Sequence, residues 1–202
     1  MSKRENFESI EWTNTWFENQ GETDKKRILF IGDSIISGAK PFLKELFNDE
    51  YYTDFFLSSR AIESELYKKE LFMNLSYCEY DFIFFNHGLH GGYMTDKIYE
   101  EHYKKTILKI KEVQKKAKLV LGLSTPVTNG IHKNEYRKFN DEVLKRNEAV
   151  KRISKKYDIH LIDCYTLVDK NTDIKSDDGY HYTDEGYKII ADKIAENIAK
   201  IK

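Results

Sequence analysis

The chain has 202 residues, and its 33 basic and 34 acidic side chains leave a formal net charge of −1. This length predicts one domain that can fold without disulfides, and a composition of 40% hydrophobic and 33% charged residues excludes a disordered chain. The balanced charge provides no field that would attract nucleic acid or an anionic membrane, so we expect neither as a partner.

The first 26 residues are predicted to form an N-terminal arm that packs on a domain formed by residues 27–202. The arm contains Trp12, Trp16 and Phe17, and aromatic side chains at such density are rarely all exposed. Its first residues, MSKRENFESIEW, lack the apolar core of a signal peptide, and no segment approaches the roughly 20 apolar residues of a membrane span. We therefore expect a cytoplasmic protein.

Short apolar runs alternate with longer segments that have helical spacing. The runs are RILFIG at 27–32, YYTDFFL at 51–57, DFIFF at 81–85, KLVLGL at 118–123 and IHLID at 159–163. Helical spacing is found over 96–117, 133–157 and 183–201. Strands that alternate with helices predict an α/β fold, specifically a three-layer α/β/α sandwich of the flavodoxin-like type with about five parallel strands.

Polar residues follow these runs, where open α/β sheets bind their ligands. The segments are Gly32-Asp33-Ser34, Ser59-Arg60-Ala61, Asn86 to Gly92, Ser124-Thr125-Pro126 and Asp177 to His181. Serine, histidine and acidic side chains would thus gather at one edge of the sheet. This composition is typical of a hydrolytic site.

Ser34 has two interpretations. It is either the cap of a helix that begins near Ile35, or a nucleophile whose backbone N–H at the helix N-terminus binds an anion. A serine nucleophile needs a base that a third group orients. Asp178 and His181, three residues apart before the last expected helix, match these roles, although each could also be a solvated loop residue. The joint occurrence of both motifs favours catalysis.

The two motifs resemble those of the SGNH hydrolases, also called GDSL esterases. The matching segments are FIGDSI at 30–35 and DGYHYTDEGYKIIADKIAENI at 178–198, and the segment from Trp12 to Ile35 with STPV at 124–127 is similar to a bacterial subgroup. The resemblance implies serine-dependent ester hydrolysis without a metal or other cofactor. It assigns Ser34 as nucleophile, His181 as general base and acid, and Asp178 as the partner of His181.

The resemblance also implies an oxyanion hole, and here the sequence departs from the family. Ala61 stands nearest the position where the family has a glycine, and a backbone N–H is retained by that change. His90 replaces the usual asparagine, and Gly91 replaces the aspartate that follows. We expect the N–H groups of Ser34 and Ala61 and the side chain of His90 to form the hole, with Asn86 as the reserve candidate. A metal site at His87 and His90 is disfavoured, because no third ligand has suitable spacing.

These features together predict a serine esterase for short acyl groups, with a carbohydrate O-acetyl ester or another small ester as substrate. Two alternatives stay open. One is acyl transfer to a sugar hydroxyl; the other is a catalytically weak binding module, suggested by the altered middle motifs. A flavin or nucleotide site is disfavoured because no glycine-rich phosphate loop follows the first strand.

Overall fold

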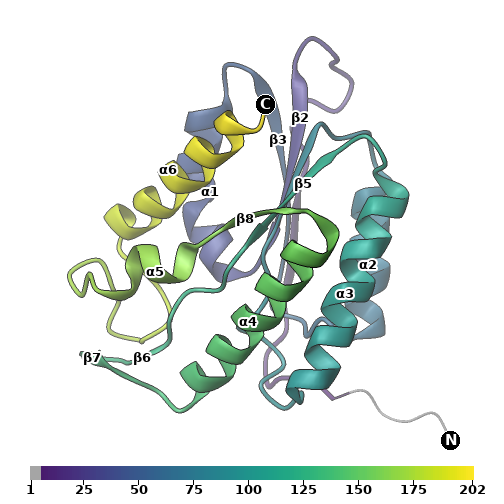
Figure 1. Ribbon diagram of the computed structural model, residues 1–202. Helices are drawn as coiled ribbons and strands as arrows, with labels where there is room; N and C mark the ends of the chain where they lie inside the picture. Colours follow the sequence, from purple (N-terminus) through teal and green to yellow (C-terminus); the bar gives the residue numbers. More distant parts are fainter. Residues whose placement is uncertain (1–5) are drawn as a thin grey trace, which may run out of the picture.

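The computed structural model describes residues 6–202, which form a six-stranded sheet between two layers of helices (Figure 1). The strands are β1 (Thr13–Trp16), β2 (Lys26–Gly32), β3 (Tyr51–Ser58), β4 (Phe82–Phe85), β5 (Lys118–Gly122) and β8 (His160–Ile162). Their order in the sheet is β1-β3-β2-β4-β5-β8, and every pair except β1 with β3 is parallel. The predicted flavodoxin-like α/β/α sandwich is confirmed, with one antiparallel edge strand added.

Helices cover both faces of the sheet, as Figure 1 shows. One layer contains α1 (Ser34–Phe47), α5 (Cys164–Asp169) and α6 (Asp184–Lys200), and the other contains α2 (Glu65–Leu75), α3 (Asp96–Val113) and α4 (Phe139–Tyr157). The two layers enclose separate apolar clusters on opposite sides of the strands. None of the helices within residues 6–202 combines the length and apolar character that crossing a membrane requires.

The central strands are apolar because both of their faces are covered. In β2, Ile28 and Phe30 point into one cluster, and Leu29 and Ile31 point into the other. The ring of Phe30 stacks on Phe55 of β3 at a centroid distance of 5.2 Å. Strands buried on both faces read as continuous apolar runs, which is why the sequence pattern located them.

The N-terminal arm contributes β1, which pairs antiparallel with the edge of β3. Trp12 packs against the apolar cluster under α1 and α6, and Phe17 stacks on Tyr77 at 4.1 Å. Trp16 is 46% exposed, and the amino group of Lys40 lies 4.3 Å from the centre of one of its rings. The expected burial therefore fails for Trp16, because β1 is itself the edge strand and has only β3 beside it. Residues 1–5 of the predicted arm lie outside the described residues.

The expected helix over 133–157 begins later than its spacing predicted. Residues 132–136 form β7 (His132–Tyr136), which pairs with β6 (Thr128–Asn129) in a hairpin, and α4 starts only at Phe139. The hairpin sequence HKNEY is polar and mostly exposed, so its strand conformation depends on backbone pairing rather than on an apolar face.

This hairpin braces the loop that precedes α6. The Thr128 N–H donates to the Gly179 carbonyl at 2.8 Å, the Arg137 guanidinium donates to the Asp178 carbonyl at 2.9 Å, and Lys133 forms an ion pair with Asp177 at 3.0 Å. Gly179 has a φ of +82°, a conformation that disfavours every residue with a Cβ. The hairpin and this glycine thus hold the backbone of the loop from Ser176 to His181.

We predict that Gly179→Ala lowers the free energy of unfolding by about 2 kcal/mol or more, since backbone strain of this kind costs about 1–3 kcal/mol. An added Cβ would also lie 2.2 Å from the Thr128 carbonyl oxygen. The matched control is Gly21→Ala, whose Cβ would meet no atom within 4 Å. Urea denaturation of both variants measures the difference, and equal midpoints would contradict the bracing role.

Candidate active site

Ser34 is the first residue of α1 and lies directly beyond the carboxyl end of β2. The cap of this helix is Asp33, whose buried carboxylate accepts a hydrogen bond from the Ile35 N–H at 2.9 Å. The interpretation of Ser34 as the helix cap is therefore wrong. Because N–H groups in the first turn lack intrahelical acceptors, Ser34 presents both a hydroxyl and an N–H where the helix favours negative charge.

Three side chains from opposite ends of the chain form a hydrogen-bonded series. His181 Nε2 lies 2.9 Å from Ser34 Oγ, and His181 Nδ1 lies 2.5 Å from Asp178 Oδ2. An ionised Asp178 can only accept, so Nδ1 carries a proton, and the free lone pair of a neutral ring is on Nε2, facing the Ser34 hydroxyl. This is the arrangement in which an imidazole can remove the serine proton.

The Asp178 carboxylate is held ionised by several donors. Partial burial raises its pKa, but the hydrogen bonds from the His181 ring and from the N–H groups of His181 and Tyr180 outweigh burial and lower the pKa to about 2. The two backbone N–H groups donate to Oδ1 at 2.8 and 2.9 Å, which leaves Oδ2 for the ring. Asp178 is therefore a fixed negative charge that orients the imidazole at neutral pH.

Close packing of α1 on α6 brings Ser34 and His181 together (Figure 1). Gly38, one turn after Ser34, faces Tyr187 of α6, and a Cβ on Gly38 would lie 2.1 Å from that ring. Thr183 caps α6 by accepting from the Gly186 N–H at 3.3 Å. The glycine permits the close helix approach, and the cap sets where the loop carrying His181 enters the helix.

His90 lies in the loop after β4, the strand next to β2, at the point where the strand order reverses. Its Nδ1 lies 3.0 Å from Oε2 of Glu8, and the other carboxylate oxygen of Glu8 accepts from the Gly91 N–H at 2.6 Å. His90 Nε2 is buried and has no hydrogen-bond partner within residues 6–202. A switch point between neighbouring strands is where α/β sheets place their ligands.

The backbone of the same loop is held by Arg146 of α4, which is 2% exposed. Its guanidinium donates to the carbonyls of Gly88, His90 and Gly91 at 2.9, 2.8 and 2.7 Å. A buried charge of this kind persists only when its donors are satisfied, and the loop carbonyls fulfil that need. The His90 backbone is thus locked between α4 and the N-terminal arm.

The structure buries both Ala61 and Asn86, the other two residues expected at the oxyanion hole. Ala61 is fully buried beside the His90 loop, since a Cβ on Gly91 would lie 2.8 Å from the Ala61 Cβ. Asn86 is also buried, but its amide donates to the Gly122 carbonyl at 2.9 Å, at the end of β5. The position of Ala61 beside the His90 loop keeps its N–H a candidate for the oxyanion hole. The Asn86 side chain instead holds the ends of β4 and β5 together.

A cavity of about 340 Å³ lies over Ser34 and His181. Its other walls come from Glu8 and Tyr180, from the loop residues Leu89, His90 and Gly92, and from Phe139 of α4. The cavity therefore combines the Ser34 hydroxyl, the His181 ring and the His90 side chain with apolar surfaces.

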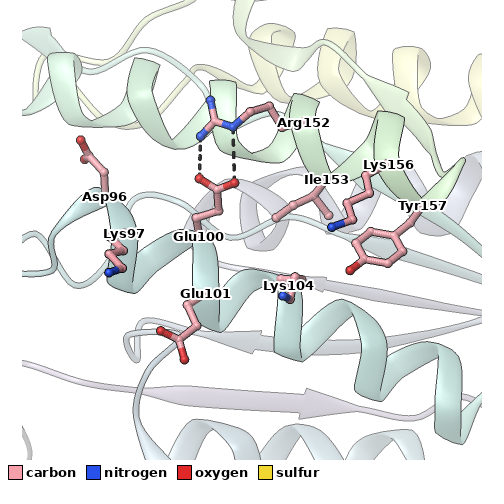
Figure 2. Close-up of a pocket in the computed structure, with 9 residues that line it drawn as sticks. All are labelled: Asp96, Lys97, Glu100, Glu101, Lys104, Arg152, Ile153, Lys156 and Tyr157. Carbon is pink, nitrogen blue, oxygen red and sulfur yellow. Dashed lines mark hydrogen bonds and ion pairs between the residues drawn. The ribbon is translucent and has the colours of Figure 1, made fainter.

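A larger cavity of about 540 Å³ lies between α3 and α4 (Figure 2). Charged side chains dominate it, and Arg152 donates to both carboxylate oxygens of Glu100, at 3.3 and 2.6 Å. Its lining contains no serine, cysteine or histidine. The smaller cavity over Ser34 is therefore the candidate active site. Within the described part of the chain, no group of three or more histidine, cysteine, aspartate or glutamate side chains is placed to hold a metal ion.

Sequence reasoning did not identify Glu8 or Arg146 as parts of this site. Glu8 contacts His90 across 82 positions of the chain, and Arg146 contacts the His90 carbonyl across 56. One stands in a polar arm and the other in a helix rich in charge. No local spacing distinguishes either residue from its exposed neighbours.

Comparisons with known proteins were made for both sequence and structure. The GDSL-like lipase/acylhydrolase family model matches residues 30–189, and no curated protein sequence matches the chain. An acetylxylan esterase from Geobacillus stearothermophilus has a TM-score of 0.67 at 13% identity, over 86% of this chain and 94% of its own. A lipase/acylhydrolase from Enterococcus faecalis gives 0.67 at 16% identity, over 87% and 96%.

A third similar structure is a GDSL-like lipase from Bacteroides thetaiotaomicron, with a TM-score of 0.62 at 22% identity over 88% of this chain and 89% of its own. At these identities the three structures show a shared fold. The family match begins in the strand that leads to Ser34 and ends in the helix that follows His181. The chain therefore belongs to the GDSL-like lipase/acylhydrolase family, the SGNH hydrolases.

Proposed function

We propose that this protein is a serine esterase that hydrolyses short-chain acyl esters, with O-acetylated carbohydrate as the first substrate class. The single observation that carries the proposal is the series from Ser34 through His181 to Asp178, with distances of 2.9 and 2.5 Å. A hydroxyl, an imidazole and an ionised carboxylate in this order are the parts of an activated serine nucleophile.

In the proposed reaction, His181 takes the Ser34 proton while Ser34 Oγ attacks the ester carbonyl. The negative charge that develops on the carbonyl oxygen is stabilised by the N–H groups of Ser34 and Ala61 and by the side chain of His90. His181 then gives its proton to the leaving alcohol, which forms the acyl-enzyme. Water activated by His181 attacks the acyl group, and the collapse of the second tetrahedral intermediate returns the proton to Ser34.

The limited apolar lining of the cavity supports a short acyl group. Its volume is about 340 Å³, and Leu89, Phe139 and Tyr180 supply its apolar walls. Carbohydrate as the alcohol part is supported by aromatic surface at Tyr180 and Phe139 and by the acetylxylan esterase among similar folds. Residues 27–202 form the proposed catalytic domain, to which the arm adds Glu8 as a wall of the site.

Acyl transfer to a sugar hydroxyl uses the same triad and is the second candidate. The observation that favours it is the openness of the site, because the side chains of His181 and Asp178 are 40% and 48% exposed. A bulky acceptor could therefore approach the acyl-enzyme. Incubating an acetylated xylo-oligosaccharide with excess unacetylated sugar separates the two reactions: acetate equal to the ester consumed indicates hydrolysis, and an acetylated acceptor indicates transfer.

We predict that Ser34→Ala lowers kcat/KM for p-nitrophenyl acetate by at least about 10³-fold, because no other hydroxyl replaces the nucleophile. Ser37→Ala is the matched control, since Ser37 lies on the exposed side of the same helix. We expect this control to retain wild-type activity. Equal rates for Ser34→Ala and the wild type would remove Ser34 from the mechanism.

A further prediction concerns acyl length. We expect kcat/KM to fall by at least about tenfold from p-nitrophenyl acetate to the decanoate ester, because only Leu89, Phe139 and Tyr180 offer large apolar surface and most of a ten-carbon chain would lie against polar walls or in water. Rates are corrected with the Ser34→Ala protein, which reports uncatalysed hydrolysis of each activated ester. Faster cleavage of the decanoate would refute the short-chain assignment.

A further inference from the structure

The N-terminal arm contacts the active-site loop through the carboxylate of Glu8. This carboxylate spans two donors, His90 Nδ1 at 3.0 Å and the Gly91 N–H at 2.6 Å. On the opposite side, Arg146 holds the carbonyls of the same loop, so the backbone has little freedom to turn away. The His90 ring is therefore oriented by a residue that lies outside the family match at 30–189.

The contact with Glu8 determines which proton His90 carries. Partial burial raises the pKa of Glu8, but hydrogen bonds from His90 and Gly91 outweigh burial, and the pKa is lowered. The ionised carboxylate accepts, so the Nδ1 of His90 bears hydrogen. A neutral ring would then have a bare lone pair on Nε2, which would repel an oxyanion. Only the doubly protonated ring offers an Nε2–H.

Several charged and titratable groups face His90 from different elements. Burial lowers the pKa of His90, but the hydrogen bond with Glu8 and the charges of Glu8 and Asp33 outweigh it and raise the pKa, against the opposing charge of Arg146. His87 is neutral, because burial lowers its pKa to about 3. The arm and the cap of α1 therefore favour the charged form of His90, and the guanidinium of α4 disfavours it.

We propose that Glu8 is a positioning residue that holds His90 doubly protonated, with Nε2–H as a charged donor to the oxyanion. This inference rests on the proposed esterase function and makes the N-terminal arm part of the active site. His90 keeps both protons throughout: the hydrogen bond strengthens as charge develops on the carbonyl oxygen and weakens when the intermediate collapses. Hydrogen bonds from charged donors are stronger than those from neutral amides, so histidine can serve here in place of asparagine.

The proposal has a definite pH dependence. Charged His90 is present below its raised pKa, so the donor is lost and kcat falls as pH rises through that pKa. Replacing Glu8 with glutamine removes the charge that favours protonation, which lowers the pKa of His90. The alkaline decline of kcat then moves to lower pH. A purely structural role for Glu8 would instead lower activity equally at every pH.

The test compares pH profiles of kcat and KM for the wild type, Glu8→Gln, Glu8→Asp and a control, Glu22→Gln. Glu22 is an exposed carboxylate of the same arm. Glu11 is unsuitable as a control because its carboxylate accepts from the Glu8 N–H at 3.3 Å. We expect Glu8→Gln to lower kcat about 10–100-fold near neutral pH with KM nearly unchanged, less than the roughly 10²–10³ for deleting a donor. The alkaline decline of kcat in Glu8→Gln should move to lower pH by about one pH unit. Glu8→Asp has a side chain too short to span both donors, so its kcat should lie between those of the wild type and Glu8→Gln. Glu22→Gln should match the wild type.

Variants that also carry His90→Asn test whether Glu8 acts through His90. An asparagine amide donates at every pH, so His90→Asn should abolish the alkaline decline, and adding Glu8→Gln should then change kcat little. NMR titration of the His90 ring reads its pKa without turnover and should show a lower value in Glu8→Gln. Three results would each overturn the proposal. They are an unchanged His90 pKa in Glu8→Gln, an unshifted alkaline decline of kcat in Glu8→Gln, and a loss of kcat from Glu8→Gln that is as large in the His90→Asn background as in the wild type. If the esterase assignment itself fails, Ser34→Ala will match the wild type, which is a separate result.

Discussion

The contact between Ser34 and His181 is the constraint on which the rest of this site depends. It requires the end of β2, the start of α1 and the loop before α6 to meet at one edge of the sheet. Close packing of α1 on α6 at Gly38 brings two segments 147 positions apart to within 2.9 Å. The β6–β7 hairpin then fixes the loop backbone, so the Ser34–His181–Asp178 series is formed by the fold itself.

The wall of the cavity that carries His90 is held in place by charged side chains. The guanidinium of Arg146 and the carboxylate of Glu8 hold the loop after β4. A buried charge needs polar partners, and here the buried Arg146 donates to loop carbonyls while the partly exposed Glu8 carboxylate pairs with His90. Each charge restricts the loop that carries the unpaired His90 nitrogen, which links the stability of the arm to the chemistry proposed for the site.

The sequence alone predicted the elements whose signal is local. Runs buried on both faces revealed the parallel strands, and Gly-Asp-Ser with Asp-x-x-His revealed three side chains that the structure places in contact. Elements stabilised by pairing were missed: β1 is a polar segment ordered by the edge of β3, and β7 has no apolar face. Glu8 was missed because its contact with His90 exists only after the sheet has formed.

The most direct measurement is covalent labelling by a fluorophosphonate, read by intact mass and peptide mapping. An activated serine forms one phosphonyl adduct, so we expect a single label on Ser34, none in Ser34→Ala, and labelling at least about 10²-fold slower in His181→Ala. No adduct in the wild type, or equal labelling rates in the wild type and His181→Ala, would show that the three groups do not act in series.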